Sequence, residues 1–281
     1  MILITSPNGK TGHALIKNLQ KNNISYRLMT SSEKSKNELL NLGFKNIIIG
    51  NLLNFNDVDK AVSGTDAIYF ITPNLSPDED LIASNIISAC SKIKNYKIVL
   101  HSVIHPQIKS LIHHWSRLGV EHKIILSGIP WVILQPTMYM QNILPQLIKI
   151  QDSFSISMPI PTSRELSMVD LDDVAEVAYK ALVDNSFNYG IFELSGYSIS
   201  LDMQARLISS YLGKKISAKQ ISIKEAKLNL KIPFKGKYGE QAFEKMFEYY
   251  SNYGLKSNSK ILEFVLKRKP TNFSQFIKKY I

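Results

Sequence analysis

A loop close to the start of the chain has the residue types and spacing of a phosphate-binding turn. The loop Ser6-Pro7-Asn8-Gly9-Lys10-Thr11-Gly12 follows an apolar run at 2–4 and precedes an amphipathic helical pattern. A helix N-terminus offers free N–H groups and a positive dipole end to an anion. We expect Gly9 to let the backbone approach a ligand and Gly12 to let the helix pack on the strand. Ser6 replaces the first glycine of the usual dinucleotide pattern, and Pro7 removes one N–H donor.

A second set of candidate residues recurs at four-residue intervals along a predicted helix, 111–127. His113, Arg117 and Glu121 share one face of this helix because four residues make about one turn. An arginine can hold a sugar hydroxyl, and a histidine can give up a proton near neutral pH. The alternative is an ion pair between Arg117 and Glu121, with a solvated histidine beside it. The spacing leaves both interpretations open.

Ser102 follows a predicted strand at 96–100, and ligands of parallel sheets sit at such strand ends. The alternative is an ordinary hydroxyl that caps the turn. His101 and His105 flank Ser102, but the pattern brings no carboxylate or cysteine to them. A metal site is therefore not expected.

Apolar runs alternate with helical patterns over the first half of the chain. The predicted strands are 2–4, 26–29, 45–49, 67–71, 96–100 and 131–134, and the predicted helices are 36–42, 56–63, 81–93 and 111–127. Strands that alternate with helices indicate a parallel sheet covered on both faces. Right-handed crossovers then give a doubly wound α/β fold.

The pattern changes after Pro136. A helix is expected at 143–150, a polar stretch at 152–164, a strand at 167–169, a helix that ends at 182 and a strand at 190–194. The last 80 or so residues are mostly helical, with a final helix at 273–280. We expect a first domain at 1–150, to which parts of 167–195 return, and a smaller, mostly helical lobe at 151–281.

Composition narrows the functional classes. Of 281 residues, 44% are hydrophobic and 20% are charged, and no apolar run approaches the roughly 18 residues of a membrane span. Met1 leads directly into a strand, and Cys90 is the single cysteine, so we expect a cytoplasmic protein in which Cys90 is a buried structural thiol. The net charge of +11 comes from widely spread lysines. No nucleic-acid-binding motif accompanies it, so neither a nucleic acid nor a membrane is an expected partner.

Several motifs along the chain together resemble one family. They are Gly9-Lys10-Thr11-Gly12, His113-His114-Trp115, Val120-Glu121, Trp131-Val132-Ile133-Leu134-Gln135-Pro136, Tyr139-Met140-Gln141-Asn142, Val169-Asp170-Leu171-Asp172-Asp173-Val174-Ala175, Phe247-Glu248-Tyr249-Tyr250, Gly254-Leu255 and Lys269-Pro270-Thr271. The chain resembles the NmrA-like group of atypical short-chain dehydrogenases/reductases over essentially its whole length. The resemblance implies a Rossmann domain that binds NAD(P).

The resemblance also implies roles for individual residues. Catalytic relatives carry a Tyr-x-x-x-Lys pair, whose positions fall here on His113 and Arg117. Ser102 occupies the position of the active-site serine. Tyr139 lies in the loop that borders the nicotinamide and the substrate, where it is a candidate proton donor or stacking wall. The alternative for Tyr139 is a packing aromatic residue.

The same resemblance implies where the cofactor would bind. The family's arginine position falls on Ser31. Ser31, Ser32 and Lys34 could hold a 2′-phosphate, which favours NADP(H) over NAD(H), whereas the alternative is a solvated loop. The complete set of implied cofactor-binding residues is Ser6, Asn8, Gly9, Lys10, Thr11, Gly12, Ser31, Ser32, Lys34, Asn51, Leu52, Thr72, Pro73, Arg117 and Pro136.

Three functional hypotheses remain open at this point. The first is an NADPH-dependent reductase of a small apolar or aromatic carbonyl, quinone or enone, in which Arg117, Ser102 and Tyr139 act. The second is a non-catalytic redox sensor that signals to a regulatory protein, favoured by the missing Tyr-x-x-x-Lys pair. The third is a biosynthetic tailoring enzyme that uses the same pocket without a nicotinamide, which the altered Ser6-Pro7 loop leaves open.

Overall fold

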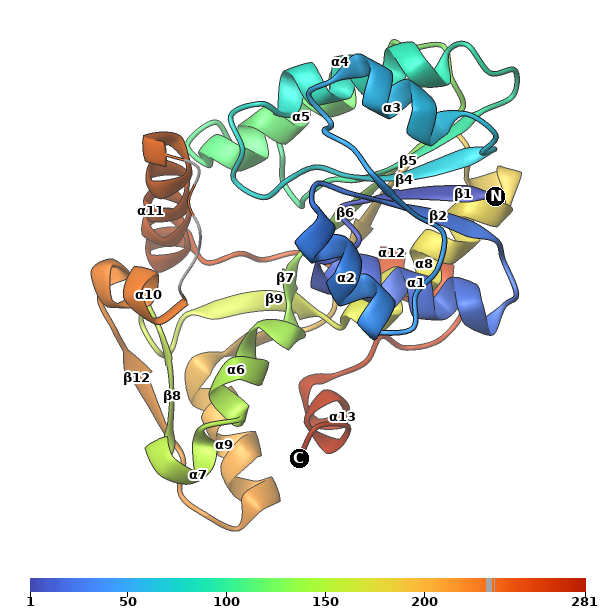
Figure 1. The fold of residues 1–281 in the computed structure, drawn as a ribbon. Helices are drawn as coiled ribbons and strands as arrows, with labels where there is room; N and C mark the ends of the chain where they lie inside the picture. The colour runs from blue at the N-terminus through green and yellow to red at the C-terminus, as the bar shows by residue number, and fades with distance from the viewer. Residues whose placement is uncertain (231–233, 235) are drawn as a thin grey trace. The chain divides into compact units, whose positions relative to one another are not determined.

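A computed structural model describes residues 1–230, 234 and 236–281, and its largest sheet has the strand order expected of a doubly wound fold (Figure 1). In the described part of the chain this sheet runs β10-β6-β5-β4-β1-β2-β3. Its strands are β1 (Ile2–Thr5), β2 (Tyr26–Thr30), β3 (Ile47–Ile49), β4 (Ala67–Ile71), β5 (Lys97–His101), β6 (Trp131–Pro136) and β10 (Gly190–Leu194). The pairs formed among β1 to β6 are parallel.

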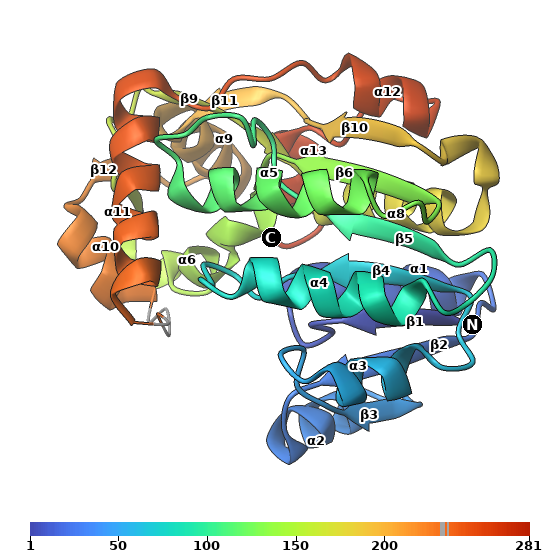
Figure 2. The same cartoon turned by 90° about the horizontal axis from the view of Figure 1, so that it is seen from above.

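Helices cover both faces of this sheet. They are α1 (Lys10–Lys21), α2 (Glu33–Asn41), α3 (Phe55–Val62), α4 (Glu79–Cys90), α5 (Ile112–Ile125) and α8 (Leu171–Val183), and η2 (Asn185–Phe187) precedes β10. Helices α3, α4 and α5 lie on one face, and α1 and α8 lie on the other (Figures 1 and 2). Buried strand residues such as Ile68 and Phe70 pack with Ile86 of α4 and Val120 of α5. The expected doubly wound parallel Rossmann fold is confirmed.

The strand order creates one edge suited to ligand binding. β1 lies between β2 and β4, so the chain leaves β1 toward one side of the sheet and later returns to build the other side. Ligands of such sheets bind beyond the carboxyl ends of the strands at this reversal. The loops that follow β1, β4 and β5 therefore form the candidate site.

The described residues group into two compact units. The first comprises residues 1–108, 113–135 and 174–192, and the second comprises 109–112, 136–173 and 193–281. The division of the chain at residue 150 remains a prediction about its domains. Cys90 lies buried in α4, as expected. In the part of the chain that the structure describes, no helix is long and apolar enough to cross a membrane.

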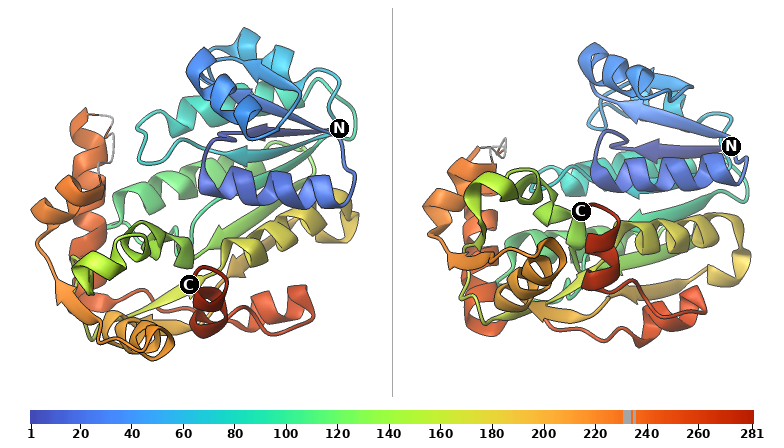
Figure 3. Two further views of the ribbon diagram at one scale, coloured as in Figure 1. Left: turned by 60° about the horizontal axis from the view of Figure 1, so that its bottom comes forward. Right: turned by 90° about the horizontal axis from the view of Figure 1, so that it is seen from below.

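The second unit combines short strands with helices. Its elements are β7 (Met138–Tyr139), η1 (Met140–Ile143), α6 (Leu144–Leu147), α7 (Ile150–Ser153), β8 (Ser155–Met158), β9 (Glu165–Val169), β11 (Ser198–Ser200), α9 (Leu201–Leu212), β12 (Ser217–Gln220), α10 (Ile223–Leu230), α11 (Gly236–Tyr253), α12 (Lys260–Leu266) and α13 (Phe273–Lys278). Strands β11, β9 and β7 form one small sheet, and β12 and β8 form another. Helix α9 packs on β8 and β12 (Figure 3). Ile156, Ile208 and Phe276 lie in the core of this unit.

Two expectations for the second unit were wrong. The single helix expected at 143–150 is replaced by η1, α6 and α7, because Pro145 lacks an N–H group and sits in the first turn of a new helix. The polar stretch at 152–164 contains β8, whose sequence Ser-Ile-Ser-Met buries Ile156 fully. Its pairing with β12 is a tertiary contact that local sequence does not encode.

Candidate functional site

The loop after β1 is tied to the end of β4 and to β2. The Thr5 hydroxyl donates to the carbonyl oxygen of Ile71 at 2.8 Å, and the Ser6 hydroxyl donates to the same oxygen at 3.2 Å. The Asn8 amide donates to the Ser35 carbonyl and accepts from the Thr30 hydroxyl, both at 2.9 Å. The side chain of Asn8 therefore holds the loop in place, and the loop offers a ligand mainly its backbone.

The two glycines of the loop differ in what surrounds them. A Cβ atom on Gly12 would lie 2.7 Å from both the Cα and the carbonyl oxygen of Pro7, so α1 can pack against the loop only with glycine at this position. A Cβ atom on Gly9 would lie 3.6 Å from the Ser6 oxygen, its nearest protein neighbour. Gly9 also has φ −77° and ψ 161°, which any residue can adopt. The protein itself leaves open the space that a side chain at Gly9 would fill.

The N-terminus of α1 fits an anion. Gly9 is the N-cap residue, no side chain caps the helix, and its first turn contains no acidic residue. Because no side chain caps this turn and no acidic side chain lies in it, the N-terminal end of the helix and its positive dipole end suit an anion. The first turn contains Lys10 and Thr11. Together with the open space at Gly9, these features fit the pyrophosphate of a dinucleotide.

The segments that would face the adenosine end lie after β2, β3 and β4. Ser31 and Lys34 are exposed, and Ser32 caps α2 by accepting from the Ser35 N–H at 3.2 Å. Asn51 accepts from the Leu53 N–H at 3.0 Å, so its side-chain oxygen is used within its own turn, while Leu52 is half-buried beside it. Thr72 is buried and Pro73 is half-buried after β4. The roles of these residues in cofactor binding remain predictions.

Arg117 is held between two strand ends by a partner that the sequence did not identify. Its Nε lies 2.9 Å from Oε1 of Glu79, the first residue of α4, and both side chains are at least nine-tenths buried. Its Nη1 donates to the His101 carbonyl at the end of β5 at 3.2 Å. Glu79 Oε1 also accepts from the Thr72 hydroxyl after β4 at 3.3 Å. Burial raises the pKa of the Glu79 carboxyl, and the charge of Arg117 opposes that shift.

Glu121 does not pair with Arg117 but with the strands behind it. The Ser102 hydroxyl donates to Glu121 Oε1 in a short hydrogen bond, and Gln135 Nε2 donates to Oε1 at 2.9 Å and to Oε2 at 3.0 Å. Ser102, Glu121 and Gln135 are all buried. Burial raises the pKa of Glu121, and the two hydrogen-bond donors and Arg117 oppose that shift. The ion pair considered from the i,i+4 spacing is thus replaced by Arg117–Glu79 and by the Ser102–Glu121–Gln135 group.

Three buried histidines surround Arg117 and remain uncharged. His101 Nδ1 lies 2.6 Å from the Tyr69 hydroxyl, and His114 Nδ1 donates to the Ile104 carbonyl at 2.6 Å. Burial, assisted by the charge of Arg117, lowers the pKa of His101 to about 3. His113 is also buried, so the solvated histidine expected at this position is not observed. Burial lowers its pKa well below the usual range, with smaller contributions from His114 and Arg117. It is therefore no imidazolium acid at neutral pH.

The buried histidines predict a specific dependence of stability on pH. Each is neutral when folded but takes up a proton below pH 6.5 when unfolded, so its contribution to stability is present above pH 6.5 and is lost as the pH falls toward the folded pKa. Between pH 6 and pH 4 the free energy of unfolding should therefore fall less steeply in His101→Asn than in the native protein, by roughly 1.4 kcal/mol per pH unit. Denaturant unfolding of both proteins at each pH measures this difference. Equal slopes would show that His101 is charged in the folded protein.

The remaining predicted residues belong to the second unit. Tyr139 lies on β7 and is half-buried, and Pro136 is buried at the end of β6. The role predicted for Tyr139 in substrate contact remains a prediction. Within the residues that the structure describes, no group of three or more His, Cys, Asp or Glu side chains is arranged to hold a metal ion.

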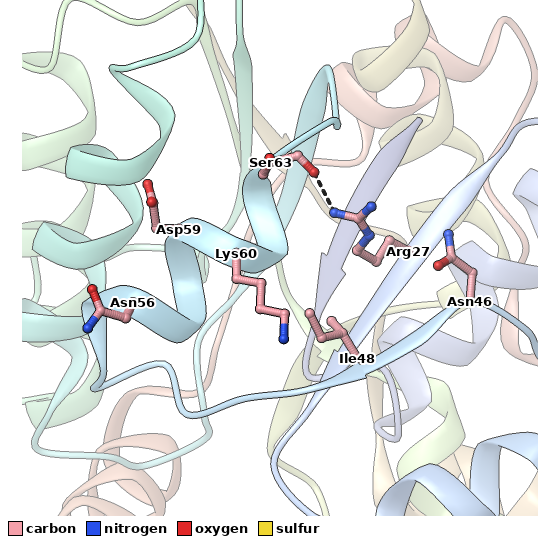
Figure 4. A pocket seen from close by; sticks show the side chains of 7 residues that line it. All are labelled: Arg27, Asn46, Ile48, Asn56, Asp59, Lys60 and Ser63. Atoms are coloured by element: carbon pink, nitrogen blue, oxygen red, sulfur yellow. Dashed lines mark hydrogen bonds between the residues drawn. The ribbon is translucent and has the colours of Figure 1, made fainter.

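A separate pocket of about 620 Å³ lies at the opposite edge of the sheet, beside β2, β3 and α3. It is lined by Arg27, Asn46, Ile48, Asn56, Asp59, Lys60 and Ser63 (Figure 4). Arg27 Nη1 donates to the carbonyl oxygens of Ala61 (2.9 Å) and Ser63 (2.6 Å), and Asp59 pairs with Lys92 at 2.8 Å. Arg27 and Asp59 thus stabilise the end of α3 and its neighbours. The loops after β1, β4 and β5, which form the candidate site, lie at the carboxyl edge of the sheet and not at this pocket.

Comparisons with known proteins agree with this architecture. The model of the NmrA-like family matches residues 1–277. Prestalk A differentiation protein A of Dictyostelium discoideum is 26% identical over 80% of this chain and 74% of its own length. An NAD(P)H azoreductase of Xenophilus azovorans is 24% identical over 81% of this chain and 79% of its own. The Citrobacter sp. triphenylmethane reductase, solved with NADP(H), superposes with a TM-score of 0.82 at 17% identity, covering 100% of this chain and 99% of that one.

Proposed function

Because this chain belongs to the NmrA-like family of NAD(P)-binding Rossmann oxidoreductases, we propose that it is an NADPH-dependent reductase of small apolar or aromatic substrates. Carbonyl, quinone, enone and azo compounds are the substrate classes in this proposal. Among the relatives, an azoreductase and a triphenylmethane reductase carry reductase names, which supports the proposal. The nicotinamide supplies the hydride when it is bound, and the protein binds and orients both reactants.

One observation carries the proposal most directly. The space that a side chain at Gly9 would fill is open, and it lies at the N-terminus of a helix whose first turn has no acid. The Arg117–Glu79 pair is anchored to the carboxyl ends of β4 and β5, which lie beside the end of β1 at the same edge of the sheet. A loop suited to pyrophosphate and a fixed cation thus occur where a dinucleotide would be expected. We assign ribose binding to Arg117 and substrate contact to Ser102 and Tyr139.

The preference for NADP(H) over NAD(H) is part of the proposal. After β2, where an acidic residue would bind the ribose hydroxyls of NAD, the chain has exposed Ser31 and Lys34. A hydroxyl and an ammonium group can bind a 2′-phosphate through charge-assisted hydrogen bonds. Glu33 lies between them and opposes an anion, so we expect only a modest preference.

Lys34→Ala should lower the ratio of NADPH affinity to NADH affinity roughly tenfold, which corresponds to about 1.4 kcal/mol. The variant should bind NADH as the native protein does, because NADH has no phosphate at this position. Calorimetric titration of both proteins with both nucleotides measures the change. An unchanged ratio would remove Lys34 from the 2′-phosphate site.

Turnover tests the reductase activity. NADPH oxidation, followed by its absorbance with a panel of quinones, enones and azo dyes, should be accelerated by the protein. Arg117→Ala should weaken both nucleotide binding and turnover. Tight NADPH binding without turnover across the whole panel would contradict the reductase proposal.

A redox sensor is the second candidate. The residue at the tyrosine position of the Tyr-x-x-x-Lys pair favours this function. His113 stands there, and because it is buried and uncharged it cannot act as an imidazolium acid. A sensor must bind NADP and NADPH with different affinities, because only differential binding can shift a conformational equilibrium. Equal affinities, measured by calorimetry, would exclude it. Either function fits a cytoplasmic protein, a location that the lone Cys90 supports.

A further inference from the structure

We propose that Glu121 supplies, through the Ser102 hydroxyl, the proton that a neutral substrate takes up together with the hydride. This inference rests on the proposed reductase function, and it assigns the source of a proton that the missing tyrosine would otherwise provide. It concerns only residues of the first unit, which come from the end of β5, from β6 and from α5.

The argument starts from the single hydrogen of the Ser102 hydroxyl. That hydroxyl is hydrogen-bonded to Glu121 Oε1, and both side chains are almost completely buried. While Glu121 is a carboxylate, it can only accept, so the hydrogen of Ser102 is committed to it. Ser102 can donate to a substrate atom only when Glu121 is protonated and donates to Oγ in its place. The proton state of Glu121 therefore decides whether Ser102 acts as a donor.

The surroundings of Glu121 suit a group that must hold a proton and then lose it. Burial favours the protonated form and raises the pKa of this carboxyl. After the proton has left, Gln135 Nε2 can donate to both carboxylate oxygens, at 2.9 and 3.0 Å. Arg117, on the same helix, is the charged group that acts on Glu121, and it also favours the carboxylate. Ser102, which directly follows β5, and Gln135 of β6 are the polar groups that donate to it from the sheet.

The position of Ser102 is fixed by the backbone. Its N–H donates to the carbonyl oxygen of Leu134 in β6 at 2.8 Å, which joins the end of β5 to the neighbouring strand. This is the carboxyl edge of the sheet, where a substrate of the proposed reductase would bind. The serine can therefore connect the buried carboxyl to that edge.

The proton transfer balances for a neutral acceptor such as an azo compound. Hydride from NADPH bonds to one azo nitrogen, and the other nitrogen gains an electron pair. This second nitrogen takes the Ser102 hydroxyl proton, while Oγ takes the proton of Glu121. NADP⁺, the hydrazine and the Glu121 carboxylate result, and water then reprotonates the carboxylate.

Reduction of a cationic triphenylmethane dye requires a hydride but no proton. Its central carbon accepts a hydride and becomes a neutral leuco dye, so no proton is needed. Comparing the two dyes in one protein thus separates proton delivery from hydride transfer and from nucleotide binding.

The test compares Glu121→Gln and Ser102→Ala with the native protein on an azo dye and on a cationic triphenylmethane dye. We expect azo reduction to fall by about 10²-fold or more, the usual contribution of a positioned acid. Triphenylmethane reduction should fall by a much smaller factor, because it needs no proton and loses only what Ser102 contributes to substrate contact. In the native protein kcat for the azo dye should fall as pH rises, and the triphenylmethane dye should show no such fall. Glu263→Gln is the control for removing a carboxylate elsewhere: this half-buried residue of α12 pairs with Lys260 at 2.9 Å, and the variant should match the native protein on both dyes.

Equal losses of activity on both dyes, with NADPH affinity unchanged, would overturn the proposed proton relay from Glu121 through Ser102. Infrared spectroscopy of the resting protein gives a readout that requires no turnover. As the pH is lowered we expect a protonated-carboxyl band to appear at a higher pH than for an ordinary glutamate, because burial raises the pKa of Glu121. This band should be absent from Glu121→Gln. Absence of that band would also overturn the relay. If the band is present and the native protein reduces neither dye, the proposed function fails instead, and the relay fails with it as a catalytic device.

Discussion

Gly12→Ala is expected to destabilise the fold, whereas Gly9→Ala is expected to fold normally and to lose nucleotide binding. At Gly12 the added methyl group would lie 2.7 Å from the Cα and the carbonyl oxygen of Pro7, which are backbone atoms that cannot rotate away. Such overpacking costs about 1–3 kcal/mol when the backbone shifts to accommodate it. We expect the free energy of unfolding to fall by at least that amount, as measured by denaturant titration.

At Gly9 the added methyl group meets no protein atom closer than 3.6 Å, and the backbone angles suit alanine. Stability should therefore stay within about 0.5 kcal/mol of the native value, as is usual for an exposed position. The methyl group would instead occupy the space beside the first N–H groups of α1. We expect affinity for NADPH to fall at least tenfold in calorimetric titration. Native affinity in Gly9→Ala would show that the phosphates do not approach the loop here.

The second large effect concerns the buried Arg117–Glu79 pair. Arg117→Met leaves the Glu79 carboxylate buried without its cation, and breaking a buried pair in this way typically costs about 3–5 kcal/mol. The double variant Arg117→Met, Glu79→Leu removes both charges, and apolar replacements of buried pairs are often neutral or stabilising. We therefore expect the double variant to regain most of the lost stability.

Nucleotide binding separates the structural role of this pair from its functional role. The single and double variants should both bind NADPH more weakly than the native protein, because both lack the guanidinium group at the strand ends. Thermal unfolding and calorimetry on the same samples measure the two properties. Native affinity in the stable double variant would mean that Arg117 only balances Glu79.

The sequence predicts the first unit well because its signals are local and repeated. Parallel strands buried on both faces appear as continuous apolar runs, and β4, which is such a strand, has the predicted bounds. The bounds of β10 at the edge of the sheet also match the prediction. Other strands and helices in this unit differ from prediction by a few residues at their ends, where capping decides the boundary. The packing role of Gly12 could be predicted from the sequence because Gly12 and Pro7 approach each other within one short loop.

The details that depend on tertiary contacts were not predictable from local pattern. Arg117 and Glu121 have the spacing of an ion pair, yet the structure pairs Arg117 with Glu79, which lies in another helix. Acidic residues are common in the first turn of a helix because they interact favourably with the helix dipole. The sequence therefore did not mark Glu79 as the partner of Arg117. Ser102 and Gln135 meet Glu121 only because β5 and β6 are neighbours in the sheet.

Calorimetric titration of the purified protein with NADPH, NADP, NADH and NAD tests the central claim most directly. We predict micromolar binding of NADPH, weaker binding of NADH and at least a tenfold loss of NADPH affinity in Gly9→Ala. Failure of the native protein to bind any of the four nucleotides would contradict the account. It would mean that the loop with Ser6 and Pro7 no longer holds a nicotinamide dinucleotide.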